Sequence, residues 1–266
     1  MKNPSDGATS TDNWQPDQYA RFAAERRMPF DELVAMCAPL DGGVAYDLGC
    51  GPGSLTAELP DRLEALRVIG TDTSAAMLEK AYLLANDRLQ FAQGDLRQLA
   101  ADVPADLIFS NAALQWVTGH DVVLSHWRSH LNDGGQIAVQ VPTNGDHPAY
   151  QLIRSLGEEL ADWFPDGPPT LAPDTVQPPE WYAELLHTLG AVEQKVQLRV
   201  FTHLLDATSE VTEWIKGTSL STYRVALGDE RFGDFEREYT KRLLEMVGDQ
   251  RPYLFTFKRV LMWARF

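Results

Sequence analysis

The sequence predicts an α/β fold, with a Rossmann-like, seven-stranded, mostly parallel sheet, helices on both of its faces and a helical cap. Two observations support this prediction. Short apolar runs typical of strands alternate with segments of helical period over the first half of the chain. Each of the first four runs is followed by a glycine or a polar residue. Because ligands of open α/β sheets bind at the carboxyl ends of the strands, we expect one binding crevice at that edge.

The first predicted strand leads into a glycine-rich loop. Val44 to Leu48 carries a carboxylate at Asp47 and is followed by Gly49-Cys50-Gly51-Pro52-Gly53. Glycine allows a tight turn and a close approach to a ligand, and Ser54 is placed to cap a following helix. The G-x-G-x-G spacing differs from the G-x-G-x-x-G pattern of dinucleotide sites. An acid at this point repels a diphosphate but attracts an ammonium group, which favours S-adenosylmethionine as the cofactor.

Three further strand ends carry polar residues. Asp72 ends the second run at the distance from the loop at which an acid binds the ribose hydroxyls in such folds. Asp95 ends the third run, where a carboxylate and a backbone amide can read adenine. The fourth run ends at Asn111 and leads to Trp116. The candidate cofactor-binding residues are Asp47, Gly49, Gly51, Gly53, Asp72, Thr73, Met77, Gly94, Asp95, Leu96, Asn111, Gln115 and Trp116.

These elements occur in the order found in class I S-adenosylmethionine-dependent methyltransferases, which the chain resembles. We predict a flexible tail over residues 1–13 and a single methyltransferase domain over residues 14–266. The strand pattern is interrupted in the second half, so the segments at about 142–190 and 205–251 are predicted to form the cap. The last strand, Tyr253 to Ala264, is expected to lie antiparallel beside the fifth, Gln136 to Val141.

Further motifs narrow the resemblance to the trans-aconitate 2-methyltransferase family. They are Trp14, Pro16, Tyr19, Phe22, Arg26 and Pro29, Ser110 to Trp116, Ala138 to Pro142, Pro179 to Leu186, Glu213 to Thr218, and Phe257 to Met262. The resemblance covers nearly the whole chain after the tail. It implies that a small polycarboxylic acid such as trans-aconitate is converted into a methyl ester.

Cationic and aromatic residues are the candidates for binding this acceptor. A guanidinium pairs with both oxygens of a carboxylate, so Arg26, Arg224 and Arg259 are predicted to hold the acid, with Tyr19 and Tyr182 as wall or hydrogen-bonding residues. A carboxylate is already ionised at neutral pH, so the reaction requires alignment rather than a general base. We therefore assign no histidine a catalytic role, and no spacing suggests a metal site.

The composition of the chain limits the classes of partner that it is expected to bind. The formal net charge is −15 with 44% hydrophobic residues, which disfavours a nucleic-acid or anionic membrane surface. The two cysteines, Cys37 and Cys50, have no metal-type spacing, and no apolar run approaches the length of a membrane span. We expect a cytoplasmic protein with a small anionic acceptor and no obligate protein partner.

Three alternatives remain at this stage. A carboxyl methyltransferase of malonyl-acyl carrier protein shares the S-N-A-x-x-Q-W type of element but requires a basic docking surface. A phenol or amine methyltransferase requires an acid or base facing the sulfonium. A regulatory protein that binds the cofactor without methyl transfer is the alternative outside enzymology.

Overall fold

The structure is a computed structural model that describes residues 23–266, with the side chains of residues 23–26 and 172–173 outside the description. One sheet contains seven strands in the order β3-β2-β1-β4-β5-β7-β6. The strands are β1 Val44–Leu48, β2 Arg67–Asp72, β3 Leu89–Gln93, β4 Ala105–Asn111, β5 Leu131–Pro142, β6 Glu193–Leu205 and β7 Tyr253–Arg265. Strands β1 to β5 pair in parallel, whereas β7 runs antiparallel to both β5 and β6. The predicted sheet and its antiparallel last strand are confirmed.

Helices cover both faces of this sheet, because successive strand residues point to opposite sides. Ala138 and Leu107 pack with α2 (Ala23–Met36) and α3 (Leu59–Arg62) on one face. Ile137 and Ile108 pack with α5 (His120–Arg128) and α7 (Pro179–Thr188) on the other. Helix α4, Ala75–Ala81, contacts β2 and β3. The central strands β1, β4 and β5 are buried on both sides, as expected for a sheet between helical layers, whereas the edge strands β3 and β6 are largely exposed.

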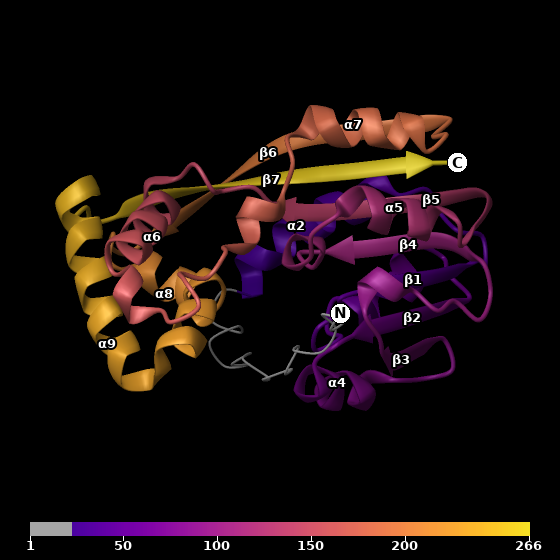
Figure 1. Cartoon of the computed structure of the whole chain (residues 1–266). Coiled ribbons are helices and arrows are strands. Elements are labelled where there is room, and N and C mark those ends of the chain that lie inside the picture. The colour runs from indigo at the N-terminus through magenta and orange to yellow at the C-terminus, as the bar shows by residue number, and fades with distance from the viewer. Residues whose placement is uncertain (1–22) are drawn as a thin grey trace, which may run out of the picture.

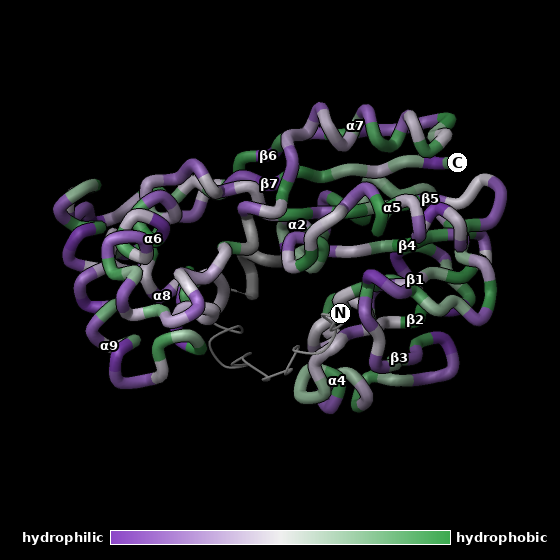
Figure 2. Tube along the Cα trace, viewed as in Figure 1, coloured by the Kyte–Doolittle hydropathy of each residue, from purple (hydrophilic) through white to green (hydrophobic). Residues whose placement is uncertain are grey.

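A helical lobe stands beyond the carboxyl ends of the parallel strands (Figure 1). It contains α6 (Pro148–Glu159), α8 (Glu210–Lys216) and α9 (Ser219–Val247), packed against the adjoining ends of β6 and β7 around a separate apolar core. Hydrophilic residues follow the outer side of α9, while hydrophobic residues run along much of the strands (Figure 2). The binding edge of the sheet therefore faces this lobe.

Two local expectations were wrong. The segment at about 142–190 was expected to form part of the cap, but α7 within it packs on the sheet, because its apolar side, including Leu186, joins a core shared with β6 and β7. Ser54 was expected to cap the helix after the glycine loop. Instead, a 3-10 turn forms at Thr56–Glu58 with Leu55 at its N-cap position and no side-chain cap. Helix α3 begins only at Leu59.

The N-terminus of α4 follows the usual pattern. Ser74 precedes the helix, and its side chain accepts a hydrogen bond from the amide of Met77 at 3.2 Å. This cap fixes where α4 begins, immediately after the carboxyl end of β2. Over residues 23–266, no helix combines the length and the apolar composition needed to cross a bilayer.

Candidate functional site

A cleft of about 380 Å³ opens at the carboxyl ends of β1 to β4. The predicted cofactor residues that line it are Asp47, Gly49, Gly51, Asp72, Thr73, Met77, Gly94, Asp95, Leu96, Asn111 and Trp116. They come from four strand ends that are distant in sequence and adjacent in the sheet. Parallel strands bring their carboxyl ends to one edge, which is why these residues converge.

The glycine loop is hydrogen-bonded to the end of β2, and its other side faces the cleft. The amides of Gly49 and Cys50 donate to the Thr71 carbonyl at 2.8 and 2.9 Å, and the Gly51 amide donates to Asp72 Oδ2 at 2.9 Å. Gly51 has φ +56°, and apart from its two chain neighbours no atom of the described residues would lie within 4 Å of a Cβ built there. The loop thus has a left-handed backbone and an unfilled side, as expected where a ligand approaches the main chain.

Asp47 lies at the base of the cleft with its carboxyl group almost fully buried. Burial raises the pKa of Asp47 to about 7, opposed by a hydrogen bond that Thr56 Oγ1 donates to Oδ2 at 2.6 Å and reinforced by the charge of Asp72. A carboxyl group poised at this pKa responds strongly to a cation placed beside it. The electrostatics of the base therefore suit a positively charged ligand.

Asp95 has a second partner that its sequence position did not reveal. Its carboxylate accepts hydrogen bonds from the Arg97 backbone amide at 2.9 Å and from Arg97 Nε at 2.9 and 3.0 Å. The hydrogen bond from the Arg97 side chain is the main cause that lowers the pKa of Asp95. Asp95 still lines the cleft, so a ligand there meets an ionised carboxylate that is already oriented by Arg97.

The cleft fits S-adenosylmethionine on two grounds. Asn111 Oδ1 is buried and finds no hydrogen-bond partner among the described residues, so an acceptor is available for a ligand donor. The lining also combines acidic groups with the apolar side chains of Met77, Leu96 and Phe109. The cationic residue in this lining is Arg97, whose guanidinium is bound to Asp95. Such a lining accepts an adenosine and a cationic methionine but repels a diphosphate.

Gly53 and Gln115 were predicted to bind the cofactor but do not line the cleft. A Cβ on Gly53 would lie 2.7 Å from Phe91 and 3.0 Å from Ala81, so this glycine allows close packing behind the loop. Gln115 is buried, and its Nε2 donates to the Ala112 carbonyl at 2.7 Å. Both residues shape the cleft from outside it.

The predicted acceptor residues do not form one cluster. Tyr182 lies in α7, where its hydroxyl is 2.7 Å from His120 Nδ1 and accepts a hydrogen bond from the Gln177 amide at 3.2 Å, so its polar group is already bonded within the protein. Arg224 is exposed on α9 and pairs with Asp229 at 2.7 Å, so it is a surface residue here. Tyr19 and the side chain of Arg26 lie outside the described residues.

Arg259 has a different position. It lies on β7 opposite Pro142 of β5, is 5% exposed, and stacks its guanidinium 4.7 Å from the centre of the Phe257 ring. A buried cation at the carboxyl edge of the neighbouring parallel strand is placed to attract an anion toward the sheet. Among the predicted acceptor residues with described side chains, Arg259 alone keeps such a position.

Several cleft residues were not predicted. They are Phe30, Cys50, Pro52, Ser54, Leu55, Arg97, Phe109, Ala112, Ala113 and Val117. Most follow the predicted motifs directly, and proximity in sequence was the available signal. Phe30 is different, because α2 brings it to the cleft edge-on to Phe109, with ring centroids 5.7 Å apart, and no local pattern indicates that contact.

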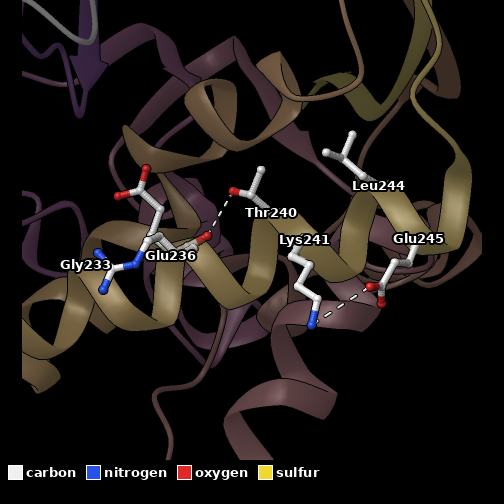
Figure 3. A pocket seen from close by; sticks show the side chains of 7 residues that line it. Gly233, Glu236, Thr240, Lys241, Leu244 and Glu245 are labelled. Atoms are coloured by element: carbon white, nitrogen blue, oxygen red, sulfur yellow. Dashed lines mark hydrogen bonds and ion pairs between the residues drawn. The ribbon is translucent and has the colours of Figure 1, made fainter.

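A second hollow lies on the helical lobe, along α9 (Figure 3). Its described lining is Gly233, Glu236, Arg237, Thr240, Lys241, Leu244 and Glu245. Thr240 donates to the Glu236 carbonyl at 2.9 Å, and Lys241 lies 4.0 Å from Glu245. Glu236 also pairs with Lys216 of α8 at 2.5 Å, and Thr240 Oγ1 lies 3.0 Å from Thr212 Oγ1 of the same helix. These polar groups are bonded within the lobe, and none of the lining residues belongs to the predicted site, so the cleft at the sheet edge remains the candidate active site.

Known proteins share this fold. Residues 45–135 match the family model of a methyltransferase domain. A methyltransferase of Bacillus halodurans superposes with a TM-score of 0.60 at 15% identity, covering 90% of this chain and 98% of that one. Geranyl diphosphate C-methyltransferase of Streptomyces coelicolor, solved with S-adenosyl-L-homocysteine, superposes with a TM-score of 0.54 at 13% identity. The superposition covers 97% of this chain and 86% of that one. At these identities the likeness shows the fold alone.

Fold and cleft together define a class I S-adenosylmethionine-dependent methyltransferase. Full-length relatives are more specific. Proteins named trans-aconitate 2-methyltransferase from Deinococcus radiodurans and Streptomyces avermitilis are 37% and 38% identical, over 94% and 95% of this chain and 97% and 96% of their own lengths. The chain belongs to the trans-aconitate 2-methyltransferase family.

Proposed function

We propose that this enzyme methylates one carboxylate of trans-aconitate, or of a closely similar small polycarboxylate, to give a methyl ester. The observation that carries the proposal is the family membership, which extends over nearly the whole chain, cap included. The strong negative charge of the protein makes a local cation necessary for such a substrate, and buried Arg259 is a candidate for it.

The cofactor contacts follow from the cleft. S-adenosylmethionine supplies an electrophilic methyl group on a positively charged sulfur. We infer that Asp72 binds the ribose hydroxyls, that Asp95 and the Leu96 amide bind adenine, and that Asp47 attracts the methionine ammonium group.

The acceptor needs positioning rather than activation. A carboxylate oxygen is already a nucleophile at neutral pH. The protein therefore contributes by aligning that oxygen with the methyl group and by matching the remaining negative charges with a guanidinium. No histidine is required as a base, in keeping with the buried, structural contacts of His120 to Tyr182 and to the Leu114 and Val117 carbonyls.

The direct test incubates the purified protein with labelled S-adenosylmethionine and a panel of di- and tricarboxylates. We expect a methyl ester of trans-aconitate, and no reaction with its neutral triester, which lacks both nucleophile and charge. Methylation of an uncharged phenol or amine, with no polycarboxylate accepted, would contradict the proposed acceptor and leave only the methyltransferase assignment.

We also infer that the enzyme works in a reducing, cytoplasmic setting on a small anionic acceptor, without nucleic acid or an obligate protein partner. Cys37 and Cys50 are free thiols, and burial raises the pKa of both, which is consistent with inert, reduced cysteines.

A further inference from the structure

Two glutamines on the same face of β5 have opposite environments. Gln136 is hydrogen-bonded at both its oxygen and its nitrogen: Oε1 accepts from the Ala38 amide at 2.8 Å and from Trp263 Nε1 at 2.7 Å, and Nε2 donates to the Ala38 carbonyl at 3.2 Å. Gln140 is fully buried, yet neither its Oε1 nor its Nε2 has a hydrogen-bond partner among the described residues. The same residue type thus serves two different purposes on one strand.

An unbonded amide in the central sheet is unfavourable for the protein alone. Buried polar groups are almost always hydrogen-bonded, since burial removes their water without replacing it. An apolar side chain of similar size would fill the same space without that cost. Gln140 therefore indicates a partner that joins the protein from outside.

The position of Gln140 identifies the region where that partner binds. Its register neighbour on β4 is Asn111, which lines the cofactor cleft and also has an unpartnered oxygen. Arg259 on β7 faces Pro142, two residues further along β5 and on the same side of the sheet. Gln140 lies between the cofactor cleft and the buried guanidinium, and it does not itself line the cleft.

We propose that Gln140 is a binding residue for the methyl acceptor. Its Nε2 group donates to a carboxylate oxygen of a small polycarboxylate whose other carboxylate pairs with Arg259. This inference rests on the proposed function and adds to it a neutral donor that fixes the acceptor between Asn111 and Arg259. Gln140 is fully buried, so contact with the acceptor requires a local opening of the structure around its amide.

The experiment compares Gln140→Leu with Gln136→Leu, a matched control on the same strand and face. We expect Gln140→Leu to melt at or above the wild-type temperature, to bind S-adenosylmethionine within twofold of wild type, and to lose at least tenfold in kcat/KM for trans-aconitate. Gln136→Leu breaks three hydrogen bonds, so it should melt several degrees lower while its kcat/KM, per folded enzyme, stays within threefold.

The outcomes separate this inference from the proposed function. Wild-type methylation of trans-aconitate with an unchanged kcat/KM in Gln140→Leu overturns only the role of Gln140. If Gln140→Leu lowers the melting temperature as much as Gln136→Leu does, Gln140 has a hydrogen-bond partner within the protein, and its proposed role is overturned as well. A loss of cofactor affinity equal to the loss in kcat/KM assigns Gln140 to the cofactor instead. No methylation of any polycarboxylate by the wild type overturns both proposals.

Discussion

Asp72 Oδ2 accepts a hydrogen bond from the backbone amide of Gly51 at 2.9 Å, so the acid at the end of β2 is tied directly to the glycine loop of β1. Its other oxygen accepts from the Ser74 amide at 2.9 Å. One carboxylate therefore orients both the loop and the start of α4. The same side chain thus orders the glycine loop and lines the cleft.

Replacing Asp72 by alanine should weaken S-adenosylmethionine binding by on the order of 1.5–3 kcal/mol, because a charged hydrogen-bond partner is lost. Calorimetric titration measures the change. In Asp72→Asn one oxygen remains as an acceptor, so we expect a smaller loss. Equal affinity in all three proteins would remove Asp72 from the cofactor site.

Gly51→Val should weaken cofactor binding further, because the branched side chain would project into the open side of the loop and oppose the left-handed backbone. Gly42→Val is the matched control, since Gly42 has φ +88° and equally open surroundings in a turn before β1. Both variants should lose similar stability in thermal melts, while only Gly51→Val should lose affinity. Normal binding by Gly51→Val would place the cofactor elsewhere.

Local patterns predicted most of the residues that line the cleft, because these residues follow the ends of parallel strands and the sheet brings those ends together. Contacts between distant segments were not predictable in this way. Tyr182 pairs with His120 across 62 positions in sequence, so its hydroxyl is directed into the core rather than toward an acceptor. Gln136 and Gln140 look alike in sequence, and only the position of Ala38 and Trp263 distinguishes the bonded one from the unbonded one.

Cofactor affinity should rise with pH between about 5.5 and 7.5. Burial raises the pKa of Asp47 to about 7, so the free protein holds a proton there at lower pH. A bound cation favours the carboxylate, and binding must then release that proton. The affinity gain is therefore present above pH 7 and is lost as the pH falls below it. Titrations in buffers of different ionisation enthalpy should detect proton release near pH 6.

Asp47→Asn supplies the control for this pH dependence. Asparagine cannot titrate, so the variant should bind the cofactor more weakly at pH 7.5 and with nearly the same affinity at pH 6 and 7.5. A wild-type affinity that is flat over this interval, or a slope that survives in Asp47→Asn, would show that another group carries the titration.

Arg259→Gln should lower kcat/KM for trans-aconitate by roughly ten- to a hundredfold, or about 1.4–2.8 kcal/mol, with cofactor affinity nearly unchanged. The reason is that a buried guanidinium beside the carboxyl edge would supply the positive charge for the acceptor. Arg259→Lys keeps the charge but loses the planar fork, so we expect a smaller defect.

Arg224→Gln is the control variant for the prediction on Arg259. Arg224 is exposed and paired with Asp229, so its loss should leave kcat/KM within about twofold, in line with the small energies of exposed ion pairs. Thermal melts must accompany the kinetics, because Arg259 also stacks on Phe257 and its replacement removes that contact.

If Arg259→Gln is folded and methylates trans-aconitate at the wild-type rate and KM, the guanidinium has a structural role and the acceptor's counter-charge lies elsewhere. If Arg224→Gln is the more defective variant, the acceptor approaches from the helical lobe rather than across β5 and β7.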